Sequence, residues 1–305
     1  MNRIVSLPLK NLPLRVLLIG LGRMGQMHLK CLAGLTSVEV AGVVDTDPTR
    51  ADAAGGFRFS RDPADFAGAF DAAIIAVPAD SHAEVALPLL AGGVDCLVEK
   101  PLALCPGEIG KMMSAARAGG AVLAVAQVER FNPQIETCTA RLGGRRGDIR
   151  VERFSRGPGG PGEPDVISDL MTHDLDWILR REGARECAID LLDWNRSAGR
   201  LHHVRCVLDF GARRYDLSAG HGEFPRRRTV RISAADGATE EFDLLDFLRG
   251  KRPDPLTRQA QAFVEACSGG ETDLATASDA LAVFRLTERI RAMCGPVFEA
   301  AGRYA

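Results

Sequence analysis

The chain has 305 residues, of which 46% are hydrophobic and 26% are charged, and its formal net charge is −2. This composition is that of an ordinary globular protein, and the length is sufficient for two hydrophobic cores. The near-neutral charge provides no basic field for a nucleic-acid backbone, and no apolar run reaches the roughly 18 residues that a membrane-spanning helix needs.

The cysteines and the N-terminal region indicate the compartment. Eight cysteines occur without a C-x-x-C pair, and most lie in apolar runs. This pattern predicts buried thiols in a reducing compartment and argues against a disulfide framework or a structural zinc site. The apolar run 14–21 is interrupted by Arg15 and followed by a glycine-rich turn, so we interpret it as a strand and not as a signal peptide. We therefore expect a cytoplasmic protein without a metal site.

From residue 14 to about residue 127, short apolar runs alternate with stretches of helical periodicity. Near-continuous apolar strands separated by helices predict a parallel sheet covered by helices on both faces. We therefore expect a doubly wound α/β, dinucleotide-binding domain over residues 1–127. The predicted strands are 15–19, 38–44, 72–77, 96–98 and 122–126.

The pattern changes after residue 132. A predicted strand over 149–156 runs into a loop rich in glycine and proline, and a helix over about 166–181 follows. Four strand-like runs then succeed one another without crossover helices, which predicts a mostly antiparallel sheet. These runs are 187–195, 203–210, 213–220 and 229–234, and two helices at about 255–267 and 276–293 end the chain. We expect a second, α+β domain over residues 128–305.

The segment Gly20–Gly25, with the sequence G-L-G-R-M-G, lies between the first predicted strand and the first predicted helix. In this context Gly20 allows a tight turn, Gly22 lets a pyrophosphate approach the backbone, and Gly25 permits close packing of helix on strand. The N–H groups at the start of the helix favour an anion. The segment therefore predicts a dinucleotide site.

Asp45 ends the second predicted strand, twenty residues after Gly25. A carboxylate at this position accepts hydrogen bonds from the ribose hydroxyls of the adenosine half and repels a 2′-phosphate. We therefore predict NAD as the cofactor, with NADP disfavoured. Arg50 lies close enough in sequence to weaken that preference.

Glu99-Lys100-Pro101 directly follows the predicted strand 96–98. Ligands of open α/β sheets bind beyond the carboxyl ends of the strands, so Lys100 is expected at the ligand cleft. A lysine there can donate to a substrate hydroxyl and help lower its pKa in the transition state. From the residues alone, a solvated loop lysine is the open alternative.

Asp169 and His173 are separated by four residues on the predicted helix of the second domain, and Asp176 lies one turn further on. Side chains at this spacing share a helix face. A carboxylate beside a histidine can fix its tautomer and allow it to act as a general base. A surface cluster of charged residues is the alternative reading of the same pattern.

Together these motifs resemble those of the Gfo/Idh/MocA-type oxidoreductases. The resemblance covers nearly the whole chain and rests on the order and spacing of Gly20–Gly25, Asp45, Val77-Pro78-x-x-x-His82, Glu99-Lys100-Pro101, Arg130-Phe131-Asn132-Pro133 and Asp169-x-x-x-His173. It implies a second domain built on a large, mostly antiparallel sheet that binds substrate, and a homodimer or homotetramer. It also implies a nicotinamide lying between Lys100 and the Asp169–His173 helix.

The resemblance also implies roles for individual residues. Lys100 would orient and polarise a substrate hydroxyl, His173 would take its proton as hydride leaves carbon for the nicotinamide, and Asp169 would position the histidine or bind a neighbouring hydroxyl. Whether Lys100 or His173 is the formal base stays open, since the two can titrate together. The expected cofactor-binding residues are Gly20, Gly22, Arg23, Met24, Gly25, Asp45, Pro78, His82, Glu99, Lys100 and Gln127.

Residues 128–133 and 169–176 look most like the branch of the family that oxidises the 3-hydroxyl of UDP-N-acetylglucosamine to the 3-keto sugar, a step that feeds amino-sugar and lipid A precursors. A nucleotide sugar needs a diphosphate site, for which Arg156 is the first candidate; Arg153 and the run 226–228 are others. The expected substrate-binding residues are thus Lys100, Arg156, Asp169 and His173. An inositol, polyol or aldose dehydrogenase, an NAD-dependent glycosidase and a non-catalytic NAD-binding sensor are the alternatives.

Overall fold

The computed structural model describes residues 13–143, 147–156, 164–222, 225–233, 238–249 and 254–295. By its internal contacts the chain forms two compact units. The first comprises the described residues within Met1–Phe131 and Pro253–Leu281, and the second those within Asn132–Arg252 and Ala282–Ala305. The units thus divide a few residues after the expected boundary at 127/128, and the first unit takes up a later segment of the chain. That residues 1–127 and 128–305 are separate folding domains stays a prediction.

The first unit is built on a seven-stranded sheet with the strand order β13-β6-β5-β4-β1-β2-β3. β1 to β6 pair in parallel, and only β13 runs antiparallel, against β6. The strands are β1 (Leu14–Ile19), β2 (Val38–Val44), β3 (Phe59–Ser60), β4 (Ala72–Ile75), β5 (Asp95–Glu99), β6 (Leu123–Ala126) and β13 (Ala275–Thr276). From β1 the sheet continues in one direction with β2 and β3, and in the other with β4, β5 and β6. Open α/β sheets bind their ligands at this switch point, which here lies between β1 and β4. The predicted doubly wound sheet is confirmed.

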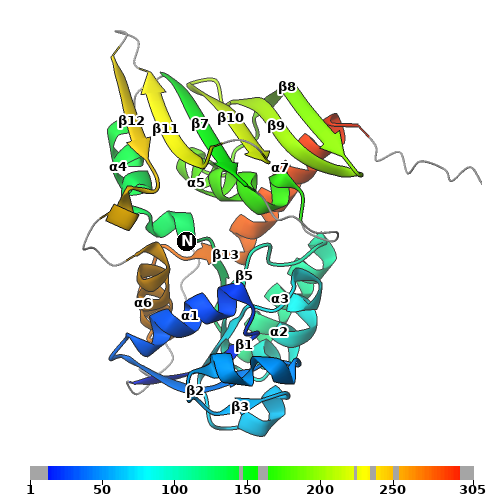
Figure 1. Ribbon diagram of the computed structural model, residues 1–305, viewed down its shortest axis with the longest axis vertical. Helices are drawn as coiled ribbons and strands as arrows, with labels where there is room; N and C mark the ends of the chain where they lie inside the picture. Colours follow the sequence, from blue (N-terminus) through cyan, green and yellow to red (C-terminus); the bar gives the residue numbers. More distant parts are fainter. Residues whose placement is uncertain are drawn as a thin grey trace, which may run out of the picture. The chain divides into compact units, whose positions relative to one another are not determined.

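Helices cover both faces of this sheet (Figure 1). α1 (Arg23–Ala33) and α6 (Pro255–Cys267) pack together on one side, and α2 (His82–Ala91) and α3 (Pro106–Gly119) on the other. Short 3-10 turns lie along the loops that follow the strands: Pro48–Ala54, Pro63–Phe66, Ala79–Ser81 and Val128–Phe131. α6 joins the first unit because its buried side chains, including Phe263 and Val264, belong to the same hydrophobic cluster as Leu14 and Leu18 of β1.

The second unit contains a six-stranded sheet with the order β12-β11-β7-β10-β9-β8. β7 and β10 pair in parallel and every other pairing is antiparallel, so the predicted mostly antiparallel sheet is confirmed. The strands are β7 (Gly147–Ser155), β8 (Ala188–Ser197), β9 (Arg200–Asp209), β10 (Arg213–His221), β11 (Arg227–Ser233) and β12 (Thr239–Asp243).

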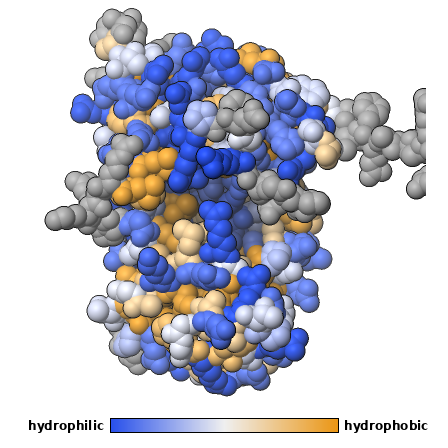
Figure 2. Space-filling model, viewed as in Figure 1, coloured by the Kyte–Doolittle hydropathy of each residue, from blue (hydrophilic) through white to orange (hydrophobic). Residues whose placement is uncertain are grey.

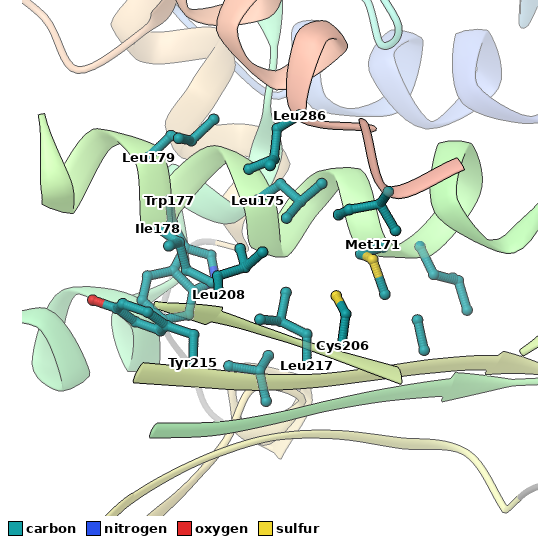
Figure 3. Packing of buried hydrophobic residues seen from close by; sticks show 14 of the residues in the cluster. Met171, Leu175, Trp177, Ile178, Leu179, Cys206, Leu208, Tyr215, Leu217 and Leu286 are labelled. Atoms are coloured by element: carbon teal, nitrogen blue, oxygen red, sulfur yellow. The ribbon is translucent and has the colours of Figure 1, made fainter. Parts of the chain in front are cut away.

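One face of this sheet is covered by α5 (Thr172–Glu182), and α7 (Ala277–Met293) packs onto α5 from residue 282 onward. Figure 3 shows Leu286 of α7 directed at α5, whose Trp177 and Ile178 lie against the strands. The rings of Trp177 and Tyr215 meet edge to face with centroids 6.0 Å apart. α4 (Pro133–Leu142), a π-helical turn (Ile167–Met171) and a 3-10 turn (Asp246–Arg249) complete the unit.

The opposite face of the six-stranded sheet is polar. Asp216 of β10 accepts hydrogen bonds from Arg150 and Arg205 of the neighbouring strands, and Arg231 pairs with Glu241. In the view of Figure 2, hydrophilic side chains predominate over this unit. Exposed ion pairs contribute about 0–1 kcal/mol each, so packing on the helix-covered face supplies most of the stability. Within the described residues, no helix is both long and apolar enough to cross a membrane.

Candidate functional site: a dinucleotide edge and a polar helix start

The glycine turn between β1 and α1 has the backbone that the sequence predicted. Gly20 has a φ of +94°, and a Cβ at this position would lie 2.6 Å from the backbone carbonyl of Ala76. A Cβ at Gly25 would collide with the carbonyl oxygen of Gly20. At Gly22, by contrast, the nearest group is the Arg50 guanidinium at 3.4 Å. The turn therefore keeps its backbone approachable at Gly22, as a pyrophosphate requires.

Asp45 is tied to this turn. Its Oδ2 accepts the N–H of Leu21 at 2.7 Å, and its Oδ1 accepts the N–H of Asp47 at 2.9 Å. Arg50 stands beside it, because its Nη1 donates to the carbonyl of Leu21 at 3.0 Å and its Nε lies 3.7 Å from Oδ2 of Asp45. The carboxylate is thus held next to the glycine turn, with a guanidinium as neighbour.

A buried histidine and a glutamate hold the backbone of Lys100. Glu99 is the last residue of β5, and its Oε2 accepts the N–H of Lys100 at 3.1 Å. Its Oε1 lies 2.8 Å from Nε2 of His28 on α1, and His28 is 1% exposed. Sequence reasoning missed His28. Its signal was a polar residue adjacent to Leu29 on the buried face of the first helix.

His82 contacts the same turn at Pro101, the residue after Lys100. Its Nδ1 lies 2.9 Å from the carbonyl oxygen of Pro101, and its Nε2 lies 3.1 Å from that of Val77. Burial lowers the pKa of His82, although the bonds to the two carbonyls oppose that shift. His82 therefore links the loop after β4, which contains Pro78, to the turn after β5. Its direct contact with a cofactor stays a prediction.

The expected cofactor-binding residues are brought to one edge of the parallel sheet. In register, Ile19 is level with Val44 and Ile75, and Val98 is level with Ile75 and Val125. The residues that follow these positions are Gly20 to Gly25 after β1, Asp45 after β2, Pro78 and His82 after β4, Glu99 and Lys100 at the end of β5, and Gln127 after β6. Gln127 is 3% exposed, and its Oε1 has no hydrogen-bond partner among the described residues.

Asp169 lies in the π-helical turn Ile167–Met171 of the second unit, and His173 lies in the first turn of α5. A continuous α-helix was expected here. The N–H of Thr172 instead bonds back to Ile167, five residues earlier. Oδ2 of Asp169 is 2.9 Å from Nε2 of His221, the last residue of β10. Sequence reasoning missed His221, because nothing local connects residues 52 positions apart.

The arginines expected at a diphosphate differ in exposure. Arg153 is 1% exposed and donates to both carboxylate oxygens of Asp174, at 2.7 and 2.8 Å. The Asp174 carboxylate thus occupies Nε and Nη2 of Arg153 in the core, which makes Arg153 a weaker candidate for a diphosphate ligand than an exposed arginine. Arg156 is exposed, and its substrate role stays a prediction. In the run 226–228, Arg227 donates to Glu152.

Within the described ranges, no group of three His, Cys, Asp or Glu side chains is arranged to hold a metal ion. Seven of the eight cysteines are buried or half-buried, and all are free thiols. Desolvation raises the pKa of Cys138 and Cys206 to about 12, as expected of inert core thiols.

Residues 14–127 match the Gfo/Idh/MocA family, which is described as an oxidoreductase family with an NAD-binding Rossmann fold. The match covers residues 14–127 of the 305, within the first unit. The resemblance drawn from its motifs is thereby confirmed, and the first unit is an NAD-binding domain.

Two curated relatives have different substrates in their names. The UDP-N-acetylglucosamine 3-dehydrogenase of Acidithiobacillus ferrooxidans is 32% identical over 174 residues, which cover 56% of this chain and 55% of that protein. The inositol 2-dehydrogenase of Rhizobium meliloti is 23% identical over 310 residues, covering 89% and 94%. The match to the first relative thus spans about half of its length.

Solved structures extend the likeness of fold to nearly the whole chain. The structure of the same Acidithiobacillus ferrooxidans enzyme superposes with a TM-score of 0.81 at 23% identity, covering 91% of this chain and 96% of that one. GenD2 from gentamicin A biosynthesis, in complex with NAD, gives 0.81 at 21% identity, covering 92% and 93%. The described part of this chain therefore has the fold of these two proteins.

Proposed function

We propose that this protein is a Gfo/Idh/MocA-type, NAD-dependent dehydrogenase that oxidises a secondary hydroxyl of a sugar. The observation that carries the proposal is the turn at Lys100. Its backbone is held by the buried carboxylate of Glu99, at the sheet edge that also carries the glycine turn and Asp45. We infer that the ammonium group of Lys100 binds an oxygen that becomes negative during oxidation.

The residues of this edge fit a dinucleotide. The open backbone at Gly22 leaves room for a pyrophosphate at the start of α1, and Asp45 lies beside the same turn. The buried Oε1 of Gln127 has no partner among the described residues and can accept a hydrogen bond from a bound ligand. When bound, NAD supplies the hydride acceptor.

The chain's own residues then have separate tasks. The ammonium group of Lys100 donates to the substrate oxygen and stabilises the charge that develops on it. The imidazole of His173 accepts the hydroxyl proton as the carbon atom gives up hydride. Asp169 binds a neighbouring hydroxyl or orients His173. Lys100 and His173 belong to different units, so their joint action on one hydroxyl is itself part of the proposal.

We further propose UDP-N-acetylglucosamine, oxidised at its 3-hydroxyl, as the substrate. Support comes from residues 128–133 and 169–176 and from the similarity to the Acidithiobacillus ferrooxidans enzyme of that name. The exposed Arg156 is the candidate ligand of the diphosphate. An inositol or other polyol is the second candidate, favoured by the inositol 2-dehydrogenase that aligns with 89% of the chain.

A substrate panel tests both levels. The protein is mixed with NAD or NADP and with UDP-sugars, inositols, other polyols and aldoses, and reduced cofactor is measured by absorbance. We expect NADH with UDP-N-acetylglucosamine and loss of turnover in Lys100→Met and His173→Ala. Lys111→Met, an exposed lysine on α3, and His202→Ala, on β9, are the matched controls. Full turnover in either site variant contradicts the mechanism, whereas turnover of inositol alone contradicts only the substrate.

Two other outcomes identify other functions. Release of a sugar from a glycoside without net NADH indicates a glycosidase, and NAD binding without turnover of any compound indicates a sensor. The homodimer or homotetramer implied by the family also stays a prediction, which light scattering on the purified protein tests.

A further inference from the structure

The proposed mechanism gives no role to the buried imidazole beside Asp169. His221 is 5% exposed, and its Nε2 lies 2.9 Å from Oδ2 of Asp169. The two residues are 52 positions apart, so the contact joins the π-helical turn to the end of β10 through tertiary structure. His221 is level with Ser155 of the parallel neighbour β7.

His221 ends a row of apolar side chains. Tyr215, Leu217 and Ala219 precede it at alternate positions of β10 and are 0%, 1% and 2% exposed. An apolar residue at position 221 would continue the row without bringing a polar ring into the core. Buried polar pairs are often no better for stability than well-packed apolar side chains. Packing alone therefore gives no reason for an imidazole at this position.

The hydrogen-bonding pattern defines what the imidazole does. An ionised carboxylate only accepts hydrogen bonds, so Nε2 of His221 is the donor to Asp169. Nδ1 of His221 is buried and has no partner among the described residues, and the tautomer protonated on Nε2 leaves no N–H group stranded there. The Asp169 side chain remains 30% exposed. His221 thus holds, from the core side, a carboxylate that a ligand can still reach.

We propose that His221 is a positioning residue for Asp169. The proposal rests on the proposed function, in which Asp169 acts at the substrate. The Nε2–H group fixes the rotamer of a carboxylate on a π-helical turn, a distortion that is frequent at functional sites. A carboxylate held in one orientation binds a hydroxyl or orients a histidine without first losing rotational freedom. His221 acts through Asp169 and touches no substrate itself.

Two substitutions of similar length test this role. Gln places an amide N–H at the same number of bonds from the backbone as Nε2, whereas Met has no donor. We expect His221→Met to lower kcat/KM for the sugar by about 10- to 100-fold, and His221→Gln to recover most of that loss. The Kd for NAD, measured by calorimetry, should stay unchanged in both, because the glycine turn belongs to the first unit. Equal losses in the two variants overturn the proposal.

A double-mutant cycle and NMR complete the test. In an Asp169→Asn background, we expect His221→Met to cause less than about a threefold further loss, because interacting residues are not additive. A full additive loss overturns the proposal. If the wild-type protein oxidises no sugar, the proposed function fails, and the imidazole 15N–1H resonance of His221 decides the pairing. That resonance should shift in Asp169→Asn; an unmoved resonance overturns the proposal independently.

Discussion

Removal of Arg153 from the core of the second unit is expected to destabilise the protein strongly. Arg153 and Asp174 are joined by two hydrogen bonds of 2.7 and 2.8 Å, and their side chains are 1% and 3% exposed. Arg153→Met leaves a buried carboxylate with the indole N–H of Trp177, 3.3 Å from Oδ1. Breaking a buried ion pair from one side costs about 3–5 kcal/mol, and we expect the free energy of unfolding to fall by that amount.

Urea unfolding followed by tryptophan fluorescence measures this loss. Trp177 is 2% exposed and contacts the pair, and a Trp194→Phe background removes the only other tryptophan. Arg150→Met is the matched control, because Arg150 lies on the same strand but is 48% exposed beside Asp216, and we expect a loss below about 1 kcal/mol. Similar small losses in both variants refute the reasoning. So does an Arg153→Met protein of normal stability that no longer binds the sugar nucleotide.

Two further predictions concern Glu99, which is buried, and Asp165, which is half-buried. His28→Leu removes the partner of Glu99 and should lower the free energy of unfolding by about 1–3 kcal/mol. It should also slow NADH formation, because Glu99 holds the backbone of Lys100 as well. Unchanged urea unfolding and unchanged kinetics contradict this prediction. Burial favours the neutral form of Asp165, but its hydrogen bonds and charge interaction with Arg291 outweigh this and hold its pKa below the ordinary 3.8. The pair therefore adds to the free energy of unfolding above pH 3.8, and this contribution is lost as the pH falls through the lower pKa of the folded state. In Asp165→Asn, the free energy of unfolding measured in urea should decrease less between neutral and acidic pH than in the wild-type protein.

The parallel sheet and the glycine turn were predictable because their signals are local. Five strands of the first unit, β1, β2, β4, β5 and β6, are short apolar runs, and the glycine turn lies directly between β1 and α1. The two-residue strands β3 and β13 have no such pattern and were not predicted. The strand 239–243 was missed because Phe242 is its only apolar residue, so it shows no alternation. The helix near 255–267 was predicted at the right place, but its unit was not, since helical periodicity does not say which core the apolar face joins.

The candidate site was predictable only in part, because some of its contacts depend on tertiary structure. Lys100 and Asp45 follow strands of a parallel sheet, so the topology alone sends them to one edge. His28 and His221 are polar residues on buried faces, and their partners are set by tertiary contacts. The sequence could not separate the core arginine Arg153 from the exposed Arg156 either, because the alternation of β7 decides which side chain faces inward.

Position 100 is a lysine, and its chemistry differs from that of an arginine of the same charge. The chain has 38 basic residues, of which only five are lysines. Arginines such as Arg153 and Arg291 are used where a planar, permanently charged fork grips a carboxylate in a fixed geometry. An ammonium group is compact and loses its proton more readily, which suits an oxygen whose charge changes during the reaction. In a chain that otherwise favours arginine, a lysine in the turn after β5 therefore supports the proposed role of Lys100 at the substrate oxygen.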